Sequence, residues 1–105
     1  MNKGIRESSG DVIGFLNSDD VYASSSVIKR VAEEFGIEKV YDNWLDVMED
    51  PDNDAVCIGT WPYMHCTLVL AALENGKHVQ TEARMATNAS EAHVMLEASK
   101  NFPDL

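Results

Sequence analysis

The sequence has no long apolar run and few basic residues. None of its apolar stretches approaches the roughly 20 residues that a membrane-spanning helix requires, so we expect no membrane span. Eight lysines and arginines stand against 18 aspartates and glutamates, which gives a net charge of −10. This charge repels phosphate backbones and anionic lipid surfaces, so nucleic acids and membranes are not expected partners. The N-terminus lacks the charged and apolar regions of a signal peptide, and we expect a cytoplasmic location.

Cysteines, metal-ligand patterns and recognised catalytic motifs are also scarce. The two cysteines, Cys57 and Cys66, each lie in an apolar context, and we predict that both are small buried side chains with reduced thiols. His78 and His93 have no second ligand at a metal-like spacing, so we interpret both as structural residues. The absence of a Gly-x-Ser-x-Gly motif and of a P-loop leaves hydrolase and kinase functions without support.

The sequence also lacks a glycine-rich dinucleotide turn. Gly4, Gly10 and Gly14 are separated by five and three residues, a spacing that does not fit Gly-x-Gly-x-x-Gly. That turn normally joins the first strand of a dinucleotide-binding sheet to its first helix and holds the cofactor pyrophosphate. We therefore expect the first βα unit of such a sheet to be missing.

Short apolar segments alternate with segments of helical periodicity along the chain. Strands are predicted at 12–16, 39–41, 55–58 and 78–81, and helices at 3–8, 28–35, 44–48, 63–74 and 90–100. Gly36 and Gly76 are the expected ends of two of these helices. Apolar strands that alternate with helices indicate a parallel sheet covered on both faces. We predict a single α/β domain over residues 1–105, built as a partial Rossmann-like, doubly wound parallel sheet of about four strands.

The second part of the chain carries several motifs of one enzyme family. Residues 40–65 read VYDNWLDVMEDPDNDAVCIGTWPYMH, and residues 71–86 read AALENGKHVQTEARMA. With these motifs, residues 36–105 resemble the cofactor-domain half of an NAD(P)-dependent oxidoreductase of the Gfo/Idh/MocA type. The resemblance implies an NAD(P) cofactor. It also implies cofactor contacts from Thr60, Pro62 and His65, in the turn between a buried strand and the next helix.

A second motif follows the last predicted strand. Glu82-Ala83-Arg84 stands where the family usually has Glu-Lys-Pro, in which the glutamate contacts the nicotinamide ribose and the lysine helps catalysis. Ala83 occupies the lysine position. Arg84 cannot replace a lysine as proton donor because its guanidinium stays protonated, although it could bind an anionic substrate. Arg84 and His65 are the residues to which a catalytic role could fall.

Three residues of the first motif also have a purely structural interpretation. Trp61 and Tyr63 could be ordinary packing aromatics, and His65 could be a residue of the first helical turn that bonds to the backbone. Both interpretations stay open at the level of the sequence.

The first part of the chain resembles a different family. Residues 1–22, MNKGIRESSGDVIGFLNSDDVY, are similar to the donor-site segment of family 2 glycosyltransferases of the GT-A fold. Asn17-Ser18-Asp19-Asp20 stands at the Asp-x-Asp position of that family. The resemblance implies that Asp19 and Asp20 hold Mg²⁺ or Mn²⁺ against a nucleotide-sugar diphosphate. The alternatives are a polar loop that caps the next helix, or an acidic Asp19 that binds the adenosine ribose.

The two resemblances together predict a chimera in which residues 1–35 and 36–105 come from different ancestors. The strand at 12–16 can take the second-strand position of the sheet, while the strand order stays open. Loss of the central first strand leaves strand edges that invite pairing with another chain, so we expect a homodimer, with strand swapping as one possible form.

The leading functional hypothesis is a truncated Rossmann-like domain related to the Gfo/Idh/MocA oxidoreductases. It would lack turnover alone, because the glycine-rich turn, the substrate domain and the usual lysine are missing, and whether it is an enzyme stays open. One alternative is a remnant glycosyltransferase donor site that binds a nucleotide-sugar with a divalent metal. The other is a ligand-free, recombined α/β module that is stable as a dimer.

Overall fold

The computed structural model of the chain describes residues 15–17, 30 and 32–105. The elements in chain order are β1 (Phe15–Asn17), α3 (Trp44–Glu49), β2 (Ala55–Gly59), α4 (Pro62–Glu74), β3 (His78–Thr81) and α5 (Ala89–Lys100). Residues 32–35 are also helical. The helix predicted at 3–8, the start of the strand at 12–16 and the start of the helix at 28–35 lie outside the described residues. That residues 1–105 form one domain therefore stays a prediction.

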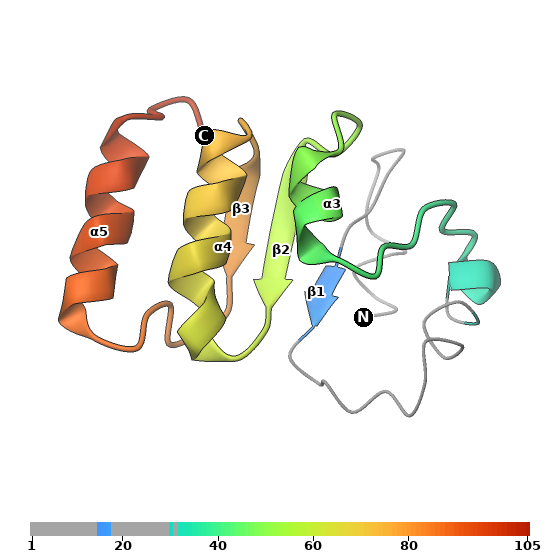
Figure 1. Ribbon diagram of the computed structural model, residues 1–105, viewed down its shortest axis with the longest axis horizontal. Coiled ribbons are helices and arrows are strands. Elements are labelled where there is room, and N and C mark those ends of the chain that lie inside the picture. Colours follow the sequence, from blue (N-terminus) through green and yellow to red (C-terminus); the bar gives the residue numbers. More distant parts are fainter. Residues whose placement is uncertain (1–14, 18–29, 31) are drawn as a thin grey trace.

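The three strands of this part of the chain form one parallel sheet in the order β1-β2-β3 (Figure 1). Phe15 is paired with Cys57, and Asn17 with Gly59. On the other side of β2, Ala55 is paired with His78. All three strands therefore end at the same edge of the sheet, as the predicted α/β class requires.

β1 lies directly beside β2, whereas the sequence allowed the second-strand position for it. In the doubly wound order 3-2-1-4-5-6, the fourth strand is the neighbour of the first. The residues of β2 are those of the fourth strand in the predicted scheme, and β1 pairs with them. The second-strand position was therefore wrong. β1 fills the first-strand place, because the edge of β2 would otherwise leave its backbone groups unpaired.

The strand predicted at residues 39–41 is also absent, since residues 37–41 have no regular secondary structure. Side chains hold this segment in place. The Lys39 Nζ lies 2.9 Å from a carboxylate oxygen of Asp50 and 2.5 Å from one of Asp52. The Tyr41 hydroxyl donates to the same Asp50 carboxylate. These contacts replace the backbone ladder that the apolar pattern predicted.

Asparagine caps begin α3 and α5, and two helices end at the predicted glycines. The Asn43 side chain accepts a hydrogen bond from the Leu45 N–H (3.0 Å) at the start of α3. The Asn88 side chain accepts one from the Glu91 N–H (2.9 Å) at the start of α5. Gly36 and Gly76 have φ values of 66° and 71°, the left-handed conformation in which glycine ends a helix without strain.

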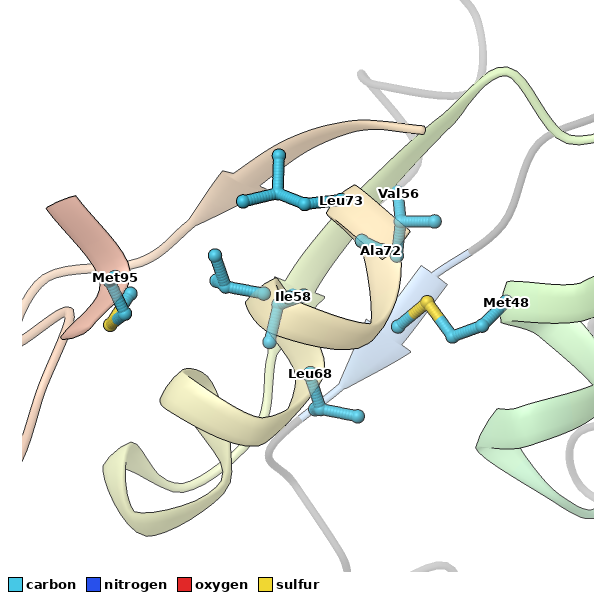
Figure 2. Packing of buried hydrophobic residues seen from close by; sticks show 8 residues of the cluster. Met48, Val56, Ile58, Leu68, Ala72, Leu73 and Met95 are labelled. Atoms are coloured by element: carbon cyan, nitrogen blue, oxygen red, sulfur yellow. The ribbon is translucent and has the colours of Figure 1, made fainter. Parts of the chain in front are cut away.

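The core lies between α4 and one face of the sheet, with α3 and α5 on either side (Figure 2). β2 alternates: Val56 and Ile58 are buried under α4, whereas Ala55 and Cys57 are exposed. The prediction that Cys57 is buried was therefore wrong, because its side chain lies on the face opposite to α4. Cys66 is partly buried, and both thiols are free. The core cluster consists of Met48, Val56, Ile58, Leu68, Val69, Ala72, Leu73 and Met95.

No helix within the described ranges is long and apolar enough to cross a membrane.

Candidate functional site

The candidate site lies at the carboxyl ends of the strands. β2 ends at Gly59, and the turn through Thr60 leads into α4 at Pro62. β3 ends at Thr81, and the N–H of Glu82 then donates to the Ile58 carbonyl (3.3 Å). The turn 59–62 and the turn 82–86 therefore lie side by side. In open parallel sheets this edge is where ligands bind.

The first turn of α4 points the positive end of the helix at this edge, and the Met64 N–H donates to the Trp61 carbonyl oxygen (3.0 Å). Trp61 is the N-cap and makes no side-chain capping bond, Pro62 opens the helix, and no acidic residue lies in the first turn. The positive end of the helix is therefore not neutralised by a side chain of its own. Trp61 and Tyr63 are 54% and 66% exposed, so the interpretation of both as packing aromatics was wrong.

His65 joins the two turns. Its side chain is 1% exposed, Nε2 lies 2.8 Å from the Thr60 carbonyl oxygen, and Nδ1 lies 2.9 Å from the Arg84 carbonyl oxygen. The interpretation of His65 as a residue bonded to the backbone is thus confirmed. A neutral imidazole carries one N–H and can donate to one of the carbonyls, whereas the protonated ring can donate to both.

The turn after β3 carries the other predicted residues. Glu82, Ala83, Arg84 and Met85 are all exposed. Arg84 has a φ of 53°, a left-handed conformation in a residue that is not glycine. The structure thus places Thr60, Pro62, His65, Glu82 and Arg84 at one edge of the sheet. Asp19 and Asp20 lie outside the described residues, while His78 and His93 are exposed.

The end of this turn is anchored to α5 by Glu91. The N–H and hydroxyl of Thr87 donate to the Glu91 carboxylate over 2.9 and 2.6 Å. These bonds lower the pKa of Glu91, with the hydroxyl bond the larger cause. Burial, and secondarily the charge of Glu91, raises the pKa of the Cys66 thiol, which argues against a nucleophilic role. No group of three metal-ligating side chains occurs in the ranges that the structure describes.

Two features of the site could not be found from sequence patterns. Left-handed backbone at Arg84 has no sequence signal, because the residue is neither glycine nor asparagine. The double contact of His65 depends on two carbonyls that are 5 and 19 residues away in the chain. The motifs indicated which residues gather, and the structure shows how they are held.

A parallel sheet with turns gathered at its carboxyl edge is the architecture of dinucleotide-binding domains. The profile of the oxidoreductase family GFO_IDH_MocA, described by its NAD-binding Rossmann fold, matches residues 7–102. The chain therefore belongs to the Gfo/Idh/MocA oxidoreductase family.

Relatives that are named as dehydrogenases are much longer than this chain. Levoglucosan dehydrogenase of Pseudarthrobacter phenanthrenivorans is 32% identical over 79 residues, which cover 75% of this chain and 20% of that enzyme. Myo-inositol 2-dehydrogenase of Thermotoga maritima is 32% identical over 84 residues, or 76% and 25% of the two chains. The chain thus spans about a fifth to a quarter of the length of these relatives.

Solved structures agree with the fold. A probable dehydrogenase from Thermotoga maritima superimposes with a TM-score of 0.71 at 29% identity, covering 85% of this chain and 26% of that one. Levoglucosan dehydrogenase in complex with NADH and levoglucosan superimposes with a TM-score of 0.66 at 32% identity, covering 74% and 21%.

The family match begins at residue 7 and so includes most of the segment that resembles a glycosyltransferase. The comparisons give no support to a glycosyltransferase segment or to a chimera.

Proposed function

We propose that this chain forms the part of an NAD(P)-binding domain that contacts the cofactor from the carboxyl edges of β2 and β3. The observation that carries the proposal is the pairing of two turns at this edge, one with Thr60 and Pro62 and the other with Glu82. NADH in the related levoglucosan dehydrogenase complex supports the choice of cofactor.

The groups present at this edge fit a dinucleotide. The positive end of α4 suits an oxygen that carries negative charge, and the exposed Glu82 carboxylate suits a ribose hydroxyl. Hydride exchange is the chemistry that NAD(P) supplies when it is bound. Ala83 has no proton to transfer and the Arg84 guanidinium keeps its own, so the role of these residues is binding and orientation rather than proton transfer.

A fluorescence titration with NADH tests the proposal, with Glu82→Ala as the informative variant. Loss of one carboxylate bond to a ribose hydroxyl weakens binding roughly tenfold. Glu74→Ala is the matched control, because Glu74 is exposed and carries the same charge. It lies at the last residue of α4, at the end of the helix away from the candidate site. Equal affinities of the two variants would contradict a cofactor contact by Glu82.

The substrates to try are those that the relatives name, levoglucosan and the inositols. Arg84 lies exposed in the same turn as Glu82 and is the residue that we assign to an anionic group of the cofactor.

Self-association is the proposed state of the chain. Within the described residues, β3 pairs with β2 on one side and has no strand on its other side. That edge exposes backbone donors and acceptors to which a second copy can add. Sedimentation velocity at two protein concentrations measures whether the chain self-associates.

The metal-dependent alternative makes a different prediction. Saturable binding of UDP that requires Mn²⁺ and is lost in Asp19→Ala would favour a donor site at Asp19 and Asp20. Binding of NADH that is indifferent to Mn²⁺ favours the oxidoreductase proposal.

A further inference from the structure

Arg84 is the one non-glycine residue with positive φ among those described, and it lies in the turn that carries Glu82. An L-residue in this conformation is disfavoured by an amount equivalent to roughly a tenfold difference in population. Arg84 therefore stays left-handed only if its surroundings hold it there.

The contact that can hold Arg84 comes from His65. Nδ1 lies 2.9 Å from the Arg84 carbonyl oxygen, while Nε2 lies 2.8 Å from the Thr60 carbonyl oxygen. The ring is almost completely buried on the first turn of α4, so it has little freedom to follow a turn that relaxes. On the far side of Arg84, Ala86 packs against the core cluster. The turn is thus fixed on both sides of residue 84.

We propose that His65 is a positioning residue that holds Arg84 left-handed through Nδ1 and so orients Glu82 and Arg84 toward the cofactor. This rests on the proposed NAD(P) site. The sequence predicted that His65 contacts the cofactor directly. Its side chain is only 1% exposed, so we assign it an indirect role through the backbone carbonyls that it contacts.

Two substitutions separate the two ring nitrogens. The amide nitrogen of asparagine lies near the position of Nδ1 and that of glutamine near Nε2, so the side chain in His65→Asn can donate to the Arg84 carbonyl and that in His65→Gln to the Thr60 carbonyl. The NADH dissociation constant should rise roughly tenfold in His65→Gln and stay within about threefold in His65→Asn. The reverse order would overturn the proposal.

A second pair of variants tests the backbone directly. In the His65→Gln background, Arg84→Gly and Arg84→Ala both remove the guanidinium, but only glycine adopts positive φ without cost. The double variant with Arg84→Gly should bind NADH within about threefold of the Arg84→Gly single variant. The double variant with Arg84→Ala should bind NADH roughly tenfold more weakly than the Arg84→Ala single variant. Equal restoration by both would contradict a backbone role.

A measurement without cofactor separates this inference from the proposed function. Backbone NMR chemical shifts of residue 84 report whether it is left-handed in each variant. The left-handed signature should be present in the wild type and His65→Asn and absent in His65→Gln. Failure of the wild type to bind NADH or NADPH would overturn the proposed function and with it the cofactor role of His65. A left-handed residue 84 in His65→Gln would overturn the inference alone.

Discussion

At the scale of single residues, Lys77 shows how a buried charge is accommodated. Its side chain is 4% exposed, and Nζ donates to the carbonyl oxygens of Asp50 (2.7 Å) and Asn53 (2.6 Å). The residue comes directly after the turn that ends α4, and both acceptors lie in the loop between α3 and β2. Lys77 therefore links the segment before β3 to the loop before β2, at the edge of the sheet opposite to the candidate site.

Replacement of Lys77 tests this link. Lys77→Met keeps most of the apolar stem but leaves two buried carbonyls without their donor, and we expect the free energy of unfolding to fall by about 2–3 kcal/mol. Lys100→Met is the control, since Lys100 makes an exposed ion pair with Glu97 that is worth at most about 0.5 kcal/mol. Urea denaturation measures both. A loss in Lys77→Met no larger than in the control would contradict the role of Lys77.

At the scale of elements, Asp50 fixes the segment before α3 to the end of that helix. The hydroxyl of Tyr41, the N–H of Asp52 and the ammonium of Lys39 lower the pKa of Asp50 from its ordinary value of 3.8 to about 2, in that order of importance. The same carboxylate raises the pKa of Tyr41. Because the folded-state pKa is depressed, this contact stabilises the fold above pH 3.8 and is lost as the pH falls toward 2.

The pH dependence of unfolding tests that contact. The urea midpoint of the wild type should fall as the pH is lowered from 4 to about 2, and Asp50→Asn should remove a part of that fall. Asp104→Asn makes the same charge change at an exposed position away from the cluster and should leave the pH profile unchanged. If the urea midpoints of the wild type and Asp50→Asn fall in parallel as the pH is lowered, the Asp50 contact does not contribute to the pH dependence of stability.

The same elements show what sequence patterns can predict. α4, α5 and β3 were predicted to within about one residue, because apolar spacing, an asparagine cap and a glycine stop are local signals. The strand predicted at 39–41 does not form. Lys39 and Tyr41 bond instead to the side chain of Asp50, which is too distant in the sequence for a short local pattern to include. Of the candidate site, the motifs pointed to Thr60, His65 and Glu82, and their cofactor contacts stay predictions. The left-handed turn at Arg84 depends on tertiary contacts that no local pattern encodes.

At the scale of the whole molecule, the position of β1 was beyond sequence reasoning, because strand order is a property of the complete sheet. The pairing of Phe15 with Cys57 and of Asn17 with Gly59 places β1 against β2, with its end at the edge of the candidate site. Helices α3, α4 and α5 lie on one face of the sheet (Figure 1). Val56 and Ile58 are buried on that face, and the Cys57 side chain is exposed on the other.

The paired turns after β2 and β3 are the proposed NAD(P) site. The most direct measurement is a titration of the isotopically labelled chain with NADH, followed by the backbone amide shifts. We predict saturable shifts at residues 59–65 and 82–86, with residues 50–53 at the opposite side of the sheet unchanged. Shifts confined to other regions, or none at saturating NADH, would contradict the claim.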